Sequence, residues 1–377
     1  MNLIERYSYL KILSVQYKRA SKKKKGKILD EVVKNLGYNR KHAIVLLLTV
    51  HKKDLRKKSI RQRARVSSYL PIVKPLKELW MTSNYLCADR LQPFIPELLK
   101  VLQKYHEIDV DDDQKKLLLS VSRATVGRLL SPVRREMFGR GKSTTRPGTL
   151  LKHQIPIQTY TPWDNQIPGF EEIDFVALCG ESLRGDYVNI LDTIDISVCW
   201  SELQGLMGKS RFEVTKALDK IRERLPFSLK GIDSDNDAPF INGHFLDYCQ
   251  INHLTFTRCR PYKKQDQAHI EQKNYSVVRK YFGYRRFDTL RQLEIINLIC
   301  ETISLYHNFF QPVMKLKEKI RIASRIKRVH DIPKTPYQRV LESTDISEET
   351  KIKLRIKYES LNPKQLLRQI IELTNTL

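Results

Sequence analysis

The sequence predicts an α/β fold: a mixed five-stranded sheet with flanking helices, preceded by basic helical regions and followed by a helical and basic C-terminal region. Apolar residues at helical spacing characterise the first third of the chain, whereas three short apolar strands follow one another after residue 169. The net charge is +26 over 377 residues, of which 41% are hydrophobic and 29% charged. This charge favours a polyanionic partner, and the apolar fraction is too high for a disordered polycation.

The first 65 residues are the most basic part of the chain, with 20 Lys or Arg against four Asp or Glu, a net +16. Apolar spacing predicts helices at Lys24–Leu36 and Arg40–Thr49, with Gly37 as the C-cap between them. A helix-turn-helix DNA-binding domain over residues 1–65 would place the start of its second helix in the major groove. The candidate DNA-contacting residues are therefore Asn39, Arg40, Lys41 and His42. A solvated helical hairpin with basic faces is the alternative.

Residues 66–140 predict a second helical domain that resembles a helix-turn-helix. The three acids at 111–113 favour a helix start, because they interact with the positive end of the helix dipole. Ser122 then caps a helix that we expect Pro132 to limit. Its candidate phosphate contacts are Arg123 and Arg128. A helix pair that only packs in the core is nearly as plausible.

Residues 141–168 predict a basic linker, and residues 169–288 predict an α/β core. Expected strands are 170–179, 187–194, 196–200, 228–233 and 255–259, and expected helices are 211–225, 239–249 and 266–282. The resulting order βββαβαβα is that of a ribonuclease-H-like core.

Three acidic residues of this core stand out by their positions. Asp174 lies in the middle of the first apolar strand, where a buried carboxylate needs a partner or a metal. Asp235 follows the fourth strand, and Glu271 lies in the first turns of the last helix, after 35 intervening residues. Taken singly, such acids are usually solvated or form turns, so the hypothesis depends on their conjunction. Asp233 is the main competitor for the second position, because residues two apart in a strand face the same way.

The neighbours of these acids resemble the integrase catalytic core of retroviral integrases and the DDE transposases of bacterial insertion sequences. The matching segments are FEEIDFVALCG around Asp174, GIDSDNDAPFIN around Asp235, and TRCRPYKKQDQAHIEQKN leading into Glu271. The flanking blocks LGYNRKHAIVLL, SRATVGRLL, NFFQPVMKL and KTPYQRVLES resemble the bacterial not-classified-yet insertion-sequence group. The resemblance thus covers most of the chain.

The resemblance implies a transposase that cuts and joins DNA. Two-metal phosphodiester cleavage needs carboxylate ligands, and Mg²⁺ prefers hard oxygen donors. We therefore expect two Mg²⁺ or Mn²⁺ ions per site, with Asp174 bridging them and Asp235 and Glu271 each completing one metal site. Residues before and along the last core helix are expected to touch DNA phosphates: Arg258, Arg260, Lys263, Lys264, Lys273, Arg279 and Lys280. The expected partners are double-stranded DNA at element ends and target, and further copies of the chain.

One position departs from the family pattern, in which Asn-Gly usually follows the second Asp. This chain has Asn236 and Asp237 there, and Asp tolerates a positive φ less well than Gly. A decayed or repurposed transposase that only binds DNA is therefore the chief alternative. A ribonuclease-H-like nuclease without strand transfer is a third hypothesis.

Residues 289–377 predict a helical and basic C-terminal region. A helix is expected over 290–305, a basic strip of net +6 over 315–328, and a last helix from Asn362. No stretch approaches the roughly 20 apolar residues of a membrane span, and charged residues interrupt the N-terminus where a signal peptide would be apolar. We expect six reduced, structural cysteines and a location in the bacterial cytoplasm, associated with the nucleoid.

Overall fold

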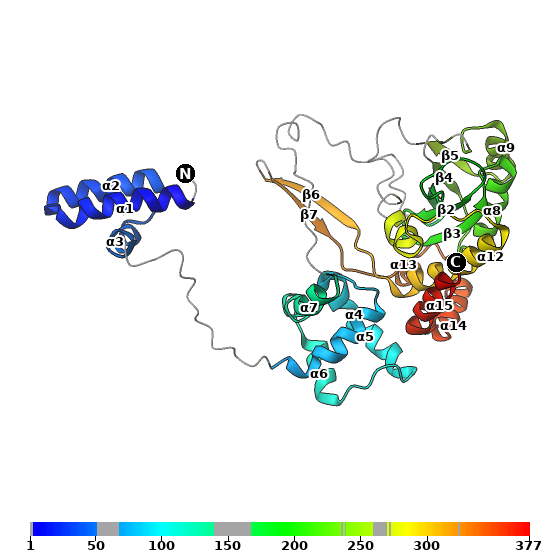
Figure 1. Ribbon diagram of the computed structural model, residues 1–377, viewed down its shortest axis with the longest axis horizontal. Coiled ribbons are helices and arrows are strands. Elements are labelled where there is room, and N and C mark those ends of the chain that lie inside the picture. Colours follow the sequence, from blue (N-terminus) through cyan, green and yellow to red (C-terminus); the bar gives the residue numbers. More distant parts are fainter. Residues whose placement is uncertain are drawn as a thin grey trace. The chain divides into compact units, whose positions relative to one another are not determined.

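A computed structural model of the chain describes residues 3–50, 68–138, 167–234, 237, 239–258, 270, 273–322 and 325–377. The chain divides into two compact units, Met1–Ser67 and Ser68–Leu377 (Figure 1). No helix in the described ranges is both long and apolar enough to cross a membrane.

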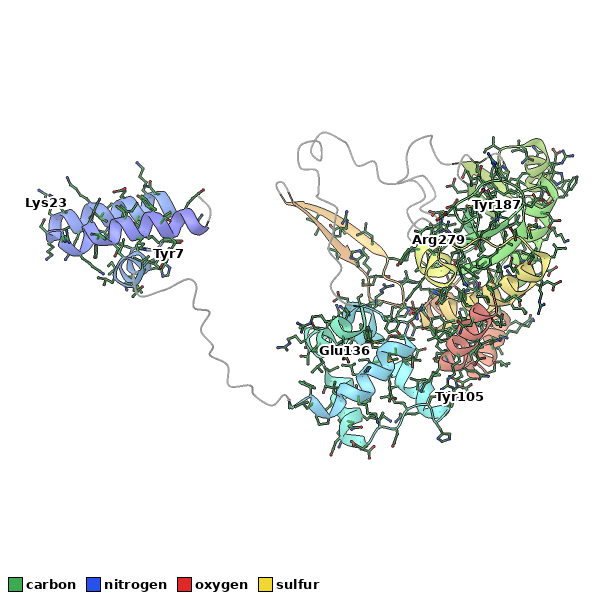
Figure 2. All side chains as sticks on the ribbon, viewed as in Figure 1. Tyr7, Lys23, Tyr105, Glu136, Tyr187 and Arg279 are labelled. Atoms are coloured by element: carbon green, nitrogen blue, oxygen red, sulfur yellow. The ribbon has the colours of Figure 1, made fainter. Side chains whose placement is uncertain are left out.

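Over residues 3–50, the first unit contains three helices, α1 (Leu3–Arg19), α2 (Lys22–Leu36) and α3 (Arg40–Thr49). Gly37 has φ 68° and donates its N–H to the carbonyl of Val33, which ends α2 in a left-handed cap. Leu13, Val32 and Leu47 are buried between the helices. Tyr7, labelled in Figure 2, donates its hydroxyl to the carbonyl of Val50 at 2.7 Å. The predicted helix, Gly turn and second helix are confirmed as local structure.

The second unit begins with a helical region. Its elements are η2 (Leu70–Ile72), α4 (Val73–Thr82), α5 (Ala88–Lys104), α6 (Asp112–Ser120) and α7 (Arg123–Phe138). Asp111 and Gln114 form a capping box at the start of α6, as the acidic run led us to expect for a helix start. The expectation that Pro132 limits α7 is wrong, because the helix continues to Phe138 with the proline inside it. One missing backbone hydrogen bond is tolerated in a helix whose Val126 and Leu130 are fully buried.

A five-stranded sheet of order β3-β2-β1-β4-β5 follows. The strands are β1 (Phe170–Ala177), β2 (Val188–Asp195), β3 (Ser201–Met207), β4 (Gly231–Ser234) and β5 (Thr255–Arg258). The first three pair antiparallel, whereas β4 and β5 run parallel to β1. The helices α8 (Arg211–Arg224) and α9 (Gly243–Ile251) connect β3 to β4 and β4 to β5. This confirms the expected mixed sheet with flanking helices.

The third strand lies later in the sequence than predicted. Residues 196–200 form a connection, in which the Asp195 carboxylate accepts the Val198 N–H at 2.7 Å and Cys199 has φ 61°. The strand then begins at Ser201. The apolar character of Val198 and Trp200 suggested a strand. These residues are apolar because they are buried in the hydrophobic core beneath the turn.

Helices cover both faces of the sheet (Figure 1). Ile173, Leu191 and Ile232 pack with α8 and α9 in one hydrophobic cluster. Val176, Ile190 and Leu203 point to the other face, into a larger cluster shared with the helical region and with the C-terminal helices. The covering elements there are η3, a π-helical stretch (Tyr275–Arg279), with α11 (Lys280–Phe282) and α12 (Leu290–Phe310).

The C-terminal part contains a separate two-stranded sheet and three helices (Figure 1). These elements are β6 (Leu316–Ile322), β7 (Arg325–His330), α13 (Pro336–Glu342), α14 (Glu348–Glu359) and α15 (Pro363–Asn375). The basic strip is thus a β-hairpin. Asn362 caps α15 by accepting the N–H groups of Lys364 and Gln365, so the predicted start of the last helix is confirmed.

Candidate active site

Several acids share one face of the sheet. Asp174 on β1 is the direct antiparallel partner of Asp192 on β2, and Glu172 is the parallel partner of Asp233 on β4. Because side chains alternate along a strand, these four carboxylates point to the same face. That face also holds Val176 and Ile190, which face the helical segment from residue 273 onward.

Asp174 is held by two hydrogen bonds. Its Oδ1 accepts the N–H of Phe175 at 2.7 Å, and its Oδ2 accepts the side-chain amide of Asn274 at 2.6 Å. A charge-assisted bond of this length is among the stronger hydrogen bonds in proteins. Asn274 lies 100 residues further along the chain, so this contact ties the last core helix directly to the centre of β1.

A second contact attaches the same segment to the sheet. The Ile270 N–H donates to Glu172 Oε2 at 3.0 Å, and Ile270 is fully buried against Ile194 and Cys199. Glu172 itself is only 3% exposed. Residues on both sides of position 271 are therefore bonded to acids of β1 that lie two residues apart.

Asp192 is the most deeply buried acid of this face. It has no solvent exposure; its Oδ1 accepts the Ser201 hydroxyl at 3.4 Å, whereas its Oδ2 has no hydrogen-bond partner among the described residues. Burial raises the pKa of Asp192 well above its ordinary value; Lys273 opposes this shift, and Asp174 adds to it. A buried carboxylate oxygen without a donor is a candidate for a cation.

Lys273 lies in the same environment. It is 8% exposed, and burial lowers its pKa, whereas Cys199 and Asp192 raise it. We expected Lys273 to touch DNA phosphates from the surface, and its burial contradicts that role. Its charge acts instead within the acidic face.

Two of the three predicted acids, Asp235 and Glu271, lie outside the described residues. Their described neighbours are informative: Ser234 is the parallel partner of Ile173, and Ile270 is bonded to Glu172. In the described part of the chain, no group of three or more His, Cys, Asp or Glu side chains is placed to hold a metal ion. The available donors on this face, beginning with Asp174 and the unpartnered oxygen of Asp192, are hard carboxylate oxygens that suit Mg²⁺ or Mn²⁺.

The competitor Asp233 lies on the same face and is bonded to the neighbouring strand β5. Its Oδ1 accepts the Thr257 hydroxyl at 2.5 Å, and it is 4% exposed. Asp237, which departs from the family pattern, forms an ion pair with Lys209 at 2.7 Å, and its carbonyl accepts the N–H of Phe240 at 3.0 Å. These bonds anchor Asp237 itself to neighbouring residues.

The predicted base contacts lie at the start of α3. The Asn39 side chain caps the helix by accepting the Lys41 N–H at 2.9 Å, and Arg40 forms an ion pair with Asp30. Lys41 and His42 are exposed. In the second unit, Arg123 and Arg128 are exposed on α7, and Arg128 donates to the Thr125 hydroxyl at 3.0 Å.

The predicted phosphate contacts near the acids are only partly described. Arg260, Lys263, Lys264 and the side chain of Arg258 lie outside the described residues. Arg279, labelled in Figure 2, is half-buried and lies over the Tyr284 ring at 4.8 Å. Lys280 is exposed and donates to the carbonyl of Asn84 at 2.8 Å.

Asn274 and Asp192 were missed in the sequence analysis. Asp192 carries a usable signal, since it is an acid inside an apolar strand, as Asp174 is. Asn274 carries little signal of its own, because an Asn in a polar helix is usually solvated.

Comparisons with known proteins find a relative over most of the chain and solved structures that align with part of it. No family model matches the sequence. The sequence is 35% identical over 342 residues to the uncharacterized protein y4rM of Sinorhizobium fredii (strain NBRC 101917 / NGR234), covering 90% of this chain and 96% of that protein. The HTLV-2 integrase catalytic core domain, in complex with magnesium and in dimeric form, aligns at TM-score 0.30 and 13% identity, covering 39% of this chain and 91% of that one. The BIV integrase catalytic core domain aligns at TM-score 0.31 and 18% identity, covering 49% and 98%.

Proposed function

We propose that this chain, which belongs to the family of the uncharacterized protein y4rM, is a DDE-type transposase of bacterial insertion sequences. Its reaction would be metal-dependent cleavage of DNA at the element ends, followed by transfer of the released strand into target DNA. Asp174, Asp235 and Glu271 would carry this reaction.

One observation supports the proposal most directly: the described residues next to all three acids meet on β1. Asn274, three residues after Glu271, donates to Asp174 at 2.6 Å. Ser234, immediately before Asp235, is the strand partner of Ile173, immediately before Asp174. Segments separated by some 60 to 100 positions in the sequence are thus joined at one point of the sheet. The functional interpretation of the acids predicts this convergence, whereas three unrelated surface acids would not require it.

The acids would hold two Mg²⁺ or Mn²⁺ ions, with Asp174 shared between them. Bound ions would lower the pKa of the attacking water and stabilise the leaving oxygen. The Asn274 amide keeps Oδ2 of Asp174 in a fixed direction, and the Phe175 N–H does the same for Oδ1. The chain needs no nucleophile of its own, since water would cut first and the released 3′ hydroxyl would then attack target DNA at the same acids.

The other parts of the chain would bind and position DNA. The exposed start of α3 would enter the major groove at the element ends, and Arg123, Arg128 and the basic hairpin of β6 and β7 would bind phosphates. Synapsis of two ends would require at least two copies of the chain. The proposed location is the bacterial cytoplasm, on the nucleoid.

The test is a nicking and joining assay on a supercoiled plasmid that carries the DNA flanking the gene, with Mn²⁺ present. Wild type should nick the plasmid and join the ends, and Asp174→Asn should abolish both while binding the same DNA. Asp247→Asn, at an exposed acid on α9, is the matched control and should retain activity. A wild-type protein that shifts the DNA without nicking it would instead be a DNA-binding protein only. Nicks without joined products would indicate a nuclease.

A further inference from the structure

An exposed aromatic ring lies at the end of the sheet where the catalytic acids are proposed to act. Phe212, the second residue of α8, is 60% exposed. Helix α8 follows β3, which runs in the same direction as β1 and β4, because β2 is antiparallel to both of its neighbours and β4 is parallel to β1. The carboxyl ends of these three strands therefore share one edge of the sheet. At that edge Ser234, the last residue of β4, is paired with Ile173, next to Asp174.

Two side chains fix the position of the Phe212 ring. The Arg211 guanidinium lies over the ring, 4.9 Å from its centroid. His244, at the start of α9, contacts the ring edge to face, with centroids 4.9 Å apart and an interplanar angle of 62°. The ring is thus held between a cation and a second ring while most of its surface faces water. A side chain that is already fixed loses little conformational freedom when a ligand binds to it.

Lys209, in the connection between β3 and α8, links the neighbourhood of this ring to the central acid. Its ammonium lies 4.8 Å from the centroid of the Phe175 ring and forms an ion pair with Asp237 at 2.7 Å. Phe175 is the residue whose N–H donates to Asp174 Oδ1. The connection after β3, which leads directly to Phe212, is therefore attached to the residue that follows the central acid.

The charges beside the ring suit a nucleotide better than a second copy of the chain. Arg211 and Lys216 are exposed, and Lys216 lies one turn after Phe212 on the same side of α8. Neither forms an ion pair with another described residue, whereas Glu213 is the one acid in the first turn of α8. A two-fold contact between copies through this face would bring its cations opposite themselves, which is unfavourable. Cations next to an exposed aromatic ring are typical of surfaces that bind single-stranded nucleic acid.

We propose that Phe212 is a stacking platform for an unpaired DNA base beside the scissile bond, with Arg211 and Lys216 binding the adjoining phosphates. The base must have left the duplex, since bases within a duplex are already covered on both sides by their neighbours. Stacking accepts every base, so the platform would position a DNA end without reading its sequence. The inference rests on the proposed function for the identity of its ligand as DNA.

The test compares two DNA ligands that differ only in the bases of a short unpaired tail at the end of a duplex. One tail carries its bases, and the other has the same phosphates but abasic sugars. Fluorescence anisotropy without divalent metal gives the affinity of the full chain for each. Wild type should bind the base-bearing tail about 5-fold or more tightly, the effect of one stacked base. Phe212→Ala and Phe212→Leu should bind both tails equally, and Phe212→Trp should keep the preference, because only Trp restores an aromatic face.

The matched control is Ile251→Ala, at an apolar residue of α9 that is 76% exposed; it should keep the preference. An undiminished preference in Phe212→Ala would overturn the proposal. Equal loss of affinity for both tails, or a marked fall in melting temperature, would give the ring a structural role and overturn it too. A lower molecular mass of Phe212→Ala in solution without DNA would assign this face to a second copy instead.

The platform and the proposed function can fail separately. A base preference that depends on Phe212, in a wild type that never nicks DNA, would leave the platform in place and refute the transposase proposal. Nicking and joining by a wild type that binds both tails equally would do the reverse.

Discussion

Replacing Asn274 with Ala tests whether the last core helix orients the central carboxylate. The Asn274 amide donates to Asp174 Oδ2 at 2.6 Å, and its own Oδ1 is buried without a hydrogen-bond partner in the described part of the chain. Loss of a hydrogen bond to a charged group costs about 1.5–3 kcal/mol, and removal of an unpaired buried acceptor returns about 1–3 kcal/mol. The two contributions nearly cancel in the free energy of unfolding.

We expect no such compensation in the affinity of the protein for a metal ion. Partners that orient metal ligands typically contribute about 10–100-fold in metal affinity. We therefore expect Asn274→Ala to keep the wild-type melting temperature within a few degrees while its Mn²⁺ affinity falls by about 10–100-fold. Titration calorimetry with Mn²⁺ on the protein without DNA measures the affinity, and scanning calorimetry measures stability.

The control for this variant is Gln250→Ala, at an exposed residue on α9, which should change neither quantity. Two results would refute the reasoning. Wild-type Mn²⁺ affinity in Asn274→Ala would show that the contact does not orient a ligand. A large fall in melting temperature with no separate change in affinity would make the amide a structural element only.

Three further predictions concern stability. Asp331→Ala should lower the free energy of unfolding in urea by about 3 kcal/mol, because the Arg339 guanidinium, only 12% exposed and now paired at 2.7 Å, loses this partner. A loss below about 1 kcal/mol would place the pair in the exposed class. Burial and repulsion from Asp195 raise the pKa of Glu171 well above its ordinary value of 4.5, so wild type should lose stability as pH rises from that ordinary value towards the raised one. Glu171→Gln should match wild type near the lower pH and exceed it near the higher one, and parallel pH profiles would contradict this. Gly205→Ala should lower the free energy of unfolding in urea by about 1–3 kcal/mol, because the added Cβ would lie 2.9 Å from Asn297 Oδ1. An unchanged urea midpoint would show that α12 can move away from the new methyl group without loss of stability.

Local sequence patterns predicted much of the sheet and the central acid. Asp174 was recognised because a charge within an apolar strand is costly, and β1 places it at the middle of the sheet. The third strand was misplaced because Val198 and Trp200 are apolar for a tertiary reason, burial under a turn, that periodicity does not separate from strand burial.

The roles of Lys273 and Asn274 could not be read from the sequence. Both follow Glu271, and helical spacing does not say which face of a helix another element covers. The π-helical stretch at Tyr275–Arg279 adds a further difficulty, since an inserted residue rotates everything after it relative to what precedes it. Asp192 became informative only when the strand register placed it opposite Asp174.

The hydrophobic cluster that joins the helical region, the sheet and α12 has a consequence for how this unit folds. Tyr306 on α12 donates to the Thr82 carbonyl at 2.7 Å, and Gln311, just after α12, donates to the Ser83 carbonyl at 3.1 Å. The end of α4 is therefore hydrogen-bonded to the helix that also covers β3. Residues 68–377 should therefore melt in one cooperative transition. A fragment limited to 169–288 would lose α12, present a bare apolar sheet face to water and aggregate.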